Sequence, residues 1–325
     1  MPLRNVRIAA GFNKADTPSG AEGQWIDGDF VRFRYGQPEK IGGFTAIGQQ
    51  TISGPTRAQH TWTDLEGNKY AALGTSKALY IYFEDKFYDV TPLATALTGA
   101  TFTSTNGSNT VTINKSSHAL DVGEYVTFTS VTLPGGGATG FTVANFQDFT
   151  YEVLTVPNAN SFTIQMQTNE SGTGMTAAGS ASINPYEEIG PTIQTYGYGW
   201  GTSTWGRGTW GSATTSSSVI LDPGSWSLDN FGQQLIATVK DGKTFVWNPG
   251  VSNPLEQRAV IMSGAPTATR LTITSDRDRH VVHFGTETTI GDSTTQDPMF
   301  IRFSDQENFS VYQPTSVNTA GTFRL

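Results

Sequence analysis

Apolar and polar residues alternate along this chain mostly with a period of two. Stretches such as Tyr125–Thr129 and Thr244–Trp247 follow this alternation and are rich in Thr, Val, Tyr, Phe and Trp, while Gly, Asn, Asp and Pro fill the intervals. A period of two places successive side chains on opposite faces of a strand, and these residue types are favoured in strands. Helical periodicity is almost absent. The pattern therefore predicts an all-β protein.

Three stretches repeat a similar succession of short strands. The first contains an apolar strand, a turn and two aromatic-rich strands, in the segments Lys69–Gly74, Leu79–Tyr82 and Lys86–Val90, with Ala58–Trp62 before them. The second contains Gln234–Thr238 and Thr244–Trp247, and the third contains Arg279–Gly285, Met299–Phe303 and Phe309–Tyr312. Units of three or four strands over roughly 40–45 residues are typical of the blades of a β-propeller. We therefore expect a β-propeller, either complete or incomplete in this chain.

The blade pattern is interrupted once, from about Leu97 to Ser182. This stretch has few charged residues and contains strands of its own at Thr110–Ile113, Tyr125–Thr129, Tyr151–Leu154 and Ser161–Gln165. It predicts a small β-sandwich or barrel inserted at an exposed loop of a blade, where insertions are tolerated. The expected division is residues 1–96 for an N-terminal segment and the first blades, 97–182 for the inserted β-domain, and 183–325 for further blades with a Gly/Trp-rich loop.

Composition excludes several classes of function. The chain has no Cys, which removes disulfides, thiolate zinc sites, iron–sulfur clusters and Cys nucleophiles. The net charge of −8 argues against a protein that binds nucleic acid by neutralising phosphates. No apolar run approaches the roughly 18 residues of a membrane span. The N-terminal residues are too polar for a secretory signal, so we expect a protein without a membrane span that is made in the cytoplasm.

Candidate catalytic or metal-binding residues are few. His280 and His283 have a spacing that directs their rings to opposite faces of a strand, so we expect polar fillers rather than a shared metal site. His118 is expected to be a turn residue rather than a catalyst, and the fourth histidine is His60. The alternating charges of Ser275–Arg279 indicate a solvated turn or a subunit salt bridge, because the run lacks the Gly and Glu of a calcium loop. We expect no catalytic residue, no metal and no cofactor, while distant paired carboxylates for glycoside hydrolysis remain open.

Two aromatic segments are candidates for interfaces. In the predicted strand Phe30–Tyr35, Arg32 and Arg34 share one face. This face could bind phosphate or the carboxylates of a neighbouring subunit, and because it has only two arginines we favour the carboxylates. The alternation of Gly and aromatic residues from Tyr196 to Gly211 could stack single-stranded nucleic acid or sugar. It contains one basic residue, so a loop packed against blades or subunits is favoured. The expected subunit or blade interface residues are Trp25, Arg32, Phe33, Arg34, Trp200, Trp205, Trp210 and Trp226.

The N-terminal residues also carry a longer motif. Residues 22–43 read Glu-Gly-x-Trp-x-Asp-x-Asp-x-Val-Arg-Phe-Arg-x-Gly-x-Pro-Glu-Lys-Ile-Gly-Gly, after a Gly-Phe-Asn at residues 11–13. Together with Ser225–Gly232 and the Gly/Trp-rich run, this resembles the tail nozzle or packaged-DNA stabilisation proteins of short-tailed phages. The segment His118–Val126 is similar to small β-modules that are common in phage structural proteins.

The resemblance implies a structural function. It implies a β-propeller that assembles as a hexameric ring below the portal and adaptor of the virion tail, retains the packaged genome and forms the DNA exit channel. The implied partners are further copies of the chain, the tail adaptor, tail fibre or spike proteins and, transiently, DNA. It carries over no catalytic residue. An acidic wall rich in Thr and Ser agrees with a channel that lets DNA pass, because it repels phosphates.

Two questions stay open at this level. Without the insert about 240 residues remain, enough for about five blades, whereas the family closes a larger propeller. Either this member is short, or the sequence is an N-terminal portion whose end at Thr322–Leu325 begins a further strand. The alternative functions are a tail-associated propeller glycosidase or glycan-binding adhesin, and an intracellular scaffold.

Overall fold

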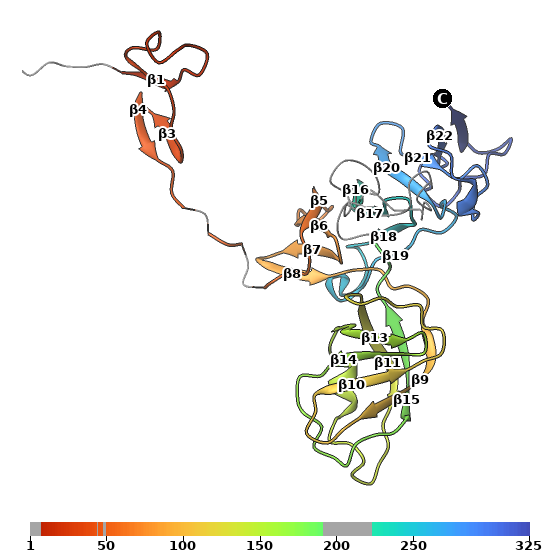
Figure 1. Cartoon of the computed structure of the whole chain (residues 1–325). Helices are drawn as coiled ribbons and strands as arrows, with labels where there is room; N and C mark the ends of the chain where they lie inside the picture. The colour runs from red at the N-terminus through yellow and green to blue at the C-terminus, as the bar shows by residue number, and fades with distance from the viewer. Residues whose placement is uncertain (1–7, 44, 48–49, 191–222) are drawn as a thin grey trace, which may run out of the picture. The chain divides into compact units, whose positions relative to one another are not determined.

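The computed structural model describes residues 8–43, 45–47, 50–190 and 223–325 of the chain. These residues belong to two compact units, residues 1–49 and residues 50–325. Strands make up most of the regular structure in both, as Figure 1 shows, so the predicted all-β fold is confirmed.

The N-terminal unit consists of two small sheets. Strand β1 (Ala9–Phe12) pairs in parallel with β2 (Gln24–Trp25), and β3 (Val31–Arg34) pairs antiparallel with β4 (Gln37–Lys40). The turn between β3 and β4 has φ of 51° at Tyr35 and 76° at Gly36, as a two-residue hairpin requires. The predicted strand Phe30–Tyr35 is therefore too long by one residue at each end. Phe30 also has a positive φ, of 55°, which ends the strand on that side.

Three four-stranded antiparallel sheets in residues 50–325 correspond to the three predicted units, and we call them the first, second and third blade sheets. In each, the strands pair in chain order. The first contains β5 (Thr56–Thr63), β6 (Lys69–Thr75), β7 (Leu79–Phe83) and β8 (Lys86–Asp89). The second contains β16 (Trp226–Phe231), β17 (Gln234–Val239), β18 (Thr244–Trp247) and β19 (Val260–Ile261). The third contains β20 (Thr269–Ser275), β21 (His280–Thr286), β22 (Phe300–Phe303) and β23 (Gly321–Arg324), and the 3₁₀ turns η1 (Pro254–Glu256) and η2 (Ser293–Thr295) lie between strands.

The predicted end of the third unit is wrong. Phe309–Tyr312 does not form its outer strand but a loop, in which Tyr312 is 2% exposed and packs its ring 5.0 Å from that of His283. The residues of this segment are apolar because the Tyr312 ring is buried beside the sheet, and not because the backbone of the segment pairs as a strand. The outer strand is β23, so the chain's last residues complete the third blade sheet and do not begin another unit.

The insert forms one curled seven-stranded sheet, which we call the inserted sheet (Figure 1). Its strands are β9 (Leu97–Ser104), β10 (Thr110–Asn114), β11 (Tyr125–Thr132), β12 (Tyr151–Glu152), β13 (Thr155–Asn158), β14 (Ser161–Gln165) and β15 (Ala178–Pro185), in the order β12-β11-β15-β9-β10-β14-β13. The short helix α1 (Val143–Gln147) begins at the capping residue Thr142 and places Phe146 in the core. The core of the inserted sheet is made by the buried side chains of Phe102, Ile113, Phe128, Phe146, Phe162 and Ile164.

The blade sheets pack on one another through their faces. Side chains of the first sheet, such as Leu79 and Ile81, share a core with Ala237 and Trp247 of the second. On the opposite face of the second sheet, Ile236 and Val246 pack with Val281 and Tyr312 of the third. The central strand β17 is therefore covered on both sides, which explains why five of its six residues are buried.

Candidate functional site: the junction of the inserted sheet with the blade sheets

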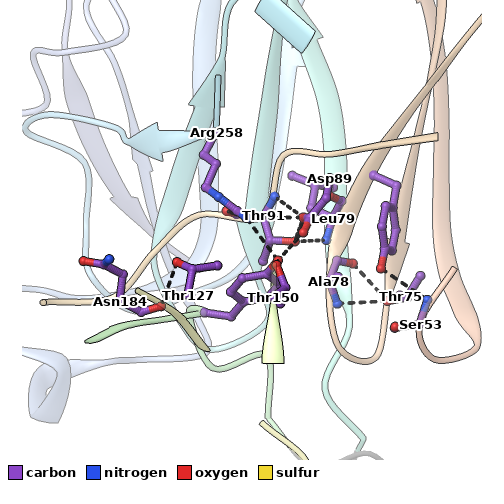
Figure 2. Close-up of polar contacts among 12 residues, drawn as sticks. Ser53, Thr75, Ala78, Leu79, Asp89, Thr91, Thr127, Thr150, Asn184 and Arg258 are labelled. Atoms are coloured by element: carbon purple, nitrogen blue, oxygen red, sulfur yellow. Dashed lines mark hydrogen bonds and ion pairs between the residues drawn. The ribbon is translucent and has the colours of Figure 1, made fainter. Parts of the chain in front are cut away.

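Polar side chains from three parts of the chain meet where the inserted sheet joins the blade sheets (Figure 2). Asp89 is the last residue of β8, Tyr186 directly follows β15, and Arg258 precedes β19. Thr150 comes from the loop before β12, and Thr91 follows β8. We call these five residues the junction.

Asp89 accepts most of the hydrogen bonds of the junction. Its Oδ1 accepts from the backbone N–H of Thr91 at 3.0 Å and from the Thr91 hydroxyl at 2.6 Å, and the Tyr186 hydroxyl donates to its Oδ2. Arg258 Nη1 lies 3.4 Å from Oδ1 and donates to the Thr91 carbonyl at 3.0 Å. Bonds to a charged acceptor are the stronger class, so this carboxylate fixes the end of β8 relative to both partners.

Tyr186 connects the inserted sheet to this carboxylate. Its hydroxyl accepts from Arg258 Nη2 at 3.1 Å and lies 3.1 Å from the Thr150 hydroxyl, while the Arg258 guanidinium stacks 4.7 Å from the ring centroid. Burial raises the pKa of Tyr186, and the adjacent Asp89 charge raises it further against the opposing charge of Arg258. The phenol therefore stays protonated and donates its hydrogen bond throughout the physiological range.

Three other contacts surround the junction. The Tyr125 hydroxyl of the inserted sheet donates to Ser53 Oγ at 3.2 Å, and Lys77 Nζ lies 2.9 Å from Glu152 Oε1. Lys243 Nζ of the second blade sheet lies 2.7 Å from Glu187 Oε1, directly after Tyr186. The inserted sheet is thus held to the first and second blade sheets at several separated points.

A cavity of about 490 Å³ lies beside these contacts. It is lined by Ser76 and Lys77 of the first blade sheet, by residues 121–125 of the inserted sheet and by residues 186–190. Glu124 lies in the wall of the cavity, and burial raises the pKa of its carboxyl group. The hydrogen bond from the Asp121 N–H lowers this pKa, whereas the negative charges of Glu188 and Asp121 raise it further. That same hydrogen bond, at 2.9 Å, closes the turn before β11, so Glu124 also shapes the chain locally.

The four histidines each lie within hydrogen-bond distance of a backbone or side-chain group of the chain. His118 is buried in a turn, where its Nδ1 accepts from the Leu120 N–H at 3.0 Å and its Nε2 lies 3.2 Å from the Asn158 carbonyl. His280 Nδ1 lies 2.7 Å from the Ser304 carbonyl, and His283 Nδ1 lies 3.0 Å from the Thr272 hydroxyl on the other face of β21. His60 stacks on Trp62 and lies 2.8 Å from Asn230 Oδ1. In the part of the chain that the structure describes, no group of three His, Cys, Asp or Glu side chains could hold a metal.

The segment Ser275–Arg279 is the turn between β20 and β21. Arg279 Nε lies 3.1 Å from Glu307 Oε2, and its guanidinium lies 4.3 Å from the Phe231 ring. Asp276 and Arg277 are exposed. The expected solvated turn is confirmed.

The predicted interface residues separate into three groups. In the N-terminal unit the Phe33 ring packs 5.2 Å from Phe12 and 6.4 Å from Trp25, and Arg32 pairs with Glu39 of its own hairpin at 3.2 Å. Arg34 lies over the Tyr35 ring at 5.4 Å.

Trp226 is buried between the first and second blade sheets. Its Nε1 donates to the Thr75 carbonyl at 3.0 Å, and its ring covers Gly74, where an added Cβ would come within 2.5 Å of it. Trp200, Trp205 and Trp210 lie outside the described residues.

The junction itself was not expected from the sequence. Its members are separated by up to 169 positions, and no spacing pattern connects Asp89 with Arg258. One available signal was their place: each lies within a residue or two of the end of an apolar strand, where a polar residue can reach a neighbouring element.

Comparison with known proteins gives little further information. No family model and no curated protein matches the sequence. Among solved structures, a protein titled "Phage phi92 endosialidase" aligns with a TM-score of 0.24 and 14% identity over 85% of this chain. The alignment covers 39% of that chain, and a similarity of this degree establishes neither a shared fold nor a shared activity. In the described residues no helix is both long enough and apolar enough to cross a membrane.

Proposed function

We propose that this chain is a structural protein of a phage tail, in which copies of it form a ring-shaped nozzle below the portal and adaptor. In this role it retains the packaged DNA and lines the exit channel. The partners are further copies in a hexamer, the adaptor and tail fibre or spike proteins, with transient contacts to DNA. It acts without catalysis.

The observation that carries the proposal is the stacking of the blade sheets. Three four-stranded antiparallel sheets follow one another and bury continuous apolar cores between their faces. This is the construction that the N-terminal motif of residues 11–43 implies by its resemblance to nozzle proteins. Sequence motif and architecture are independent observations, and they favour the same class of protein.

The chemistry of the junction also supports a structural role. The hydroxyl of Tyr186, the carboxylate of Asp89 and the guanidinium of Arg258 bond to one another and to backbone groups. Such a network orients the inserted sheet, as is needed if that sheet presents a surface to a tail partner. It contains no nucleophile activated by a neighbouring base.

Electron microscopy of the purified chain and of virions labelled with an antibody against it tests the proposal. We expect six-fold rings of the purified protein and label at the tail below the portal. A monomer or trimer that degrades a host polysaccharide would refute the nozzle and support the tail glycosidase instead. Absence of the chain from purified virions would refute any virion role.

A further inference from the structure

The side of the inserted sheet that faces away from its core carries two rows of uncharged polar side chains, and we call these rows the polar face. They lie on the neighbouring strands β9, β10, β14 and β13 (Figure 1). The first row is Thr101, Asn114, Ser161 and Asn158, and the second is Thr103, Thr112, Thr163 and Thr155. Residues that alternate with them, such as Phe102, Ile113 and Phe162, fill the core of the inserted sheet.

The polar face has an unusual composition for a surface that meets water. None of its four strands contains an Asp, Glu, Lys or Arg residue, and the eight side chains of the two rows are half-buried or exposed. Charged residues usually make up about 25–35% of a soluble protein surface. A preference for strand formation explains the Thr residues but not Asn114, because Asn is depleted in strands and this one is paired on both sides.

A cavity of about 480 Å³ lies at the first row of the polar face. The first row lines it together with Gly99, Lys115, Ser116 and Asn160. Lys115 is the only charged residue among these lining residues, and its Nζ donates to the Thr98 carbonyl at 2.7 Å. The volume of the cavity is within the range of small-molecule sites.

Several hydrogen-bonding groups of this cavity have no partner among the described residues. The side-chain oxygen of Asn158 accepts from the Asn160 N–H at 2.8 Å, and that of Asn160 accepts from the Ser117 N–H at 3.1 Å. Only the oxygen of an amide can accept from an N–H, so both NH₂ groups are left to donate. Asn114 is oriented the other way, because its Nδ2 donates to the Thr103 hydroxyl at 2.9 Å and its oxygen is left to accept.

These groups match the hydroxyls of a sugar. Each sugar hydroxyl can both donate and accept, and the Ser and Thr hydroxyls and Asn amides of the polar face offer both kinds of group. A nucleic acid would need clustered Lys and Arg for its phosphates, whereas only Lys115 lines the cavity. The binding energy of protein interfaces comes largely from aromatic and Arg side chains, and neither kind belongs to the two rows. The four strands also lack the paired carboxylates of glycoside hydrolysis, so a sugar would be bound here without being cleaved.

We propose that the polar face is a binding site for a chain of uncharged sugars. Each row spans about 14 Å across the four strands, which is three spacings of about 4.8 Å, so the face is wider than a single sugar ring. The cavity receives one unit of the chain, and the second row contacts the units beside it. The site goes beyond the proposed function, because retention and passage of DNA need no sugar. It would give a tail protein a contact with a neutral polysaccharide of the host surface.

Native gels that contain dextran, mannan or galactan test this site. The mobility of the full-length protein should fall as the concentration of at least one of these neutral polysaccharides is raised, and this dependence gives the dissociation constant. Polysialic acid, which carries a carboxylate on every unit, should leave the mobility unchanged. Unchanged mobility in all three neutral polysaccharides overturns the inference, as does retardation by polysialic acid alone.

The double variant Thr101→Val/Thr112→Val tests the hydroxyls of the polar face. Val retains the shape of Thr and its preference for strands, and neither hydroxyl has a partner among the described residues, so the variant should fold as the wild type does. Circular dichroism verifies this. With two hydrogen bonds lost, the retarding polysaccharide should bind at least roughly fivefold more weakly. Thr61→Val/Thr63→Val makes the same change at exposed positions of β5 and should leave binding unchanged. Equal binding by the two double variants would contradict the assignment.

Asn160→Asp tests the cavity. The carboxylate still accepts from the Ser117 N–H but cannot donate, so the polysaccharide should bind roughly two- to tenfold more weakly. The matched control is Asn308→Asp, in an exposed turn where the side-chain oxygen accepts from the Ser310 N–H at 3.0 Å. This change should leave binding as it is in the wild type. If both variants bind equally, the cavity is not part of the site and the inference is wrong.

The site and the proposed function fail separately. Six-fold rings below the portal together with unchanged mobility in all neutral polysaccharides would leave the nozzle standing and overturn the site. Retardation that depends on Thr101, Thr112 and Asn160, in a protein absent from purified virions, would support the site and refute the proposed function.

Discussion

The buried His283 predicts that the blade sheets lose stability in mild acid. Its side chain is fully buried on β21, its Nδ1 lies 3.0 Å from the Thr272 hydroxyl, and its Nε2 has no hydrogen-bond partner among the described residues. Burial, and then the nearby charge of Arg302, lower the pKa of His283 from 6.5 to about 3. The imidazole is therefore neutral in the folded protein at every pH above this value.

The sign of the effect follows from proton binding. Below pH 6.5 the unfolded chain takes up a proton on this ring, whereas the folded protein does not until about pH 3. The contribution of His283 is thus fully present above pH 6.5 and is lost as the pH falls toward 3. Each pH unit within this window lowers the free energy of unfolding by up to about 1.4 kcal/mol, so at pH 4.5 the loss is on the order of 3 kcal/mol.

Urea unfolding of the wild type and of His283→Asn isolates this contribution. Asn cannot titrate but can still bond to the Thr272 hydroxyl, and carboxylates elsewhere affect both proteins equally. Trp62, Trp226 and Trp247 lie in the core shared by the first two blade sheets, and the inserted sheet has no Trp, so the fluorescence change on unfolding includes the blade core and receives no contribution from a Trp of the inserted sheet. Between pH 7.5 and 4.5 the free energy of unfolding of the wild type should fall by roughly 3 kcal/mol more than that of the variant. Parallel pH profiles would show that His283 is not held neutral by burial.

Two further predictions concern the contacts between sheets. Tyr186→Phe removes the hydroxyl that donates to Asp89 and accepts from Arg258, and urea titrations should show the free energy of unfolding lowered by about 1.5–3 kcal/mol. The control is Tyr82→Phe, which removes a hydroxyl that donates to Asp85 on the surface and should lower the free energy of unfolding by under about 0.5 kcal/mol. Equal effects would mean that the junction does not hold the inserted sheet. Gly74→Ala places a methyl group against the Trp226 ring and should cost about 1–3 kcal/mol, with a shift in Trp fluorescence. Gly135→Ala, at a position of the inserted domain where an added Cβ meets no atom within 4 Å, should produce neither effect. An unshifted spectrum and unchanged stability would show that the ring can move aside.

Much of the fold follows from local pattern. The hairpins β6–β7 and β17–β18 have alternating side chains and short turns, and both were predicted within a residue or two of their observed bounds. The strands β9, β13 and β15 of the inserted sheet were not predicted, because Gly, Ala and Thr in them give little alternation. In the third blade sheet, prediction from the local pattern failed for a second reason. Its outer strand follows a 17-residue interval, and no local signal distinguishes a buried loop aromatic such as Tyr312 from a strand residue.

The candidate site was less accessible from the sequence. The predictions that His118 is not a catalyst and that Ser275–Arg279 is not a calcium-binding loop needed only the spacing of residues along the sequence, since both depend on neighbours in the chain. The junction depends on which strand ends the topology brings together, and the pairing of β15 with β9 and β11 decides that Tyr186 reaches Asp89. The expectation that Arg32 meets a neighbouring subunit stays a prediction, and the pattern did not reveal Glu39, which the register of the same hairpin places directly opposite Arg32.

The few charged residues of this chain are used largely for orientation. Charged residues make up 15% of the sequence. Two ion pairs, Lys77–Glu152 and Lys243–Glu187, connect the inserted sheet and its flanking residues with the blade sheets, and a third, Arg258–Asp89, connects the end of β8 in the first blade sheet with the residues before β19 in the second. Partly exposed pairs of this kind each contribute about 0–1 kcal/mol, so together they add little to stability. Two ion pairs at separate points, together with the hydrogen bonds of the Tyr186 hydroxyl to Asp89 and Arg258, however, fix the direction in which the inserted sheet lies on the blade sheets. In the ring proposed above every copy must present the same surface, and these contacts would give the inserted sheet the fixed direction that this requires.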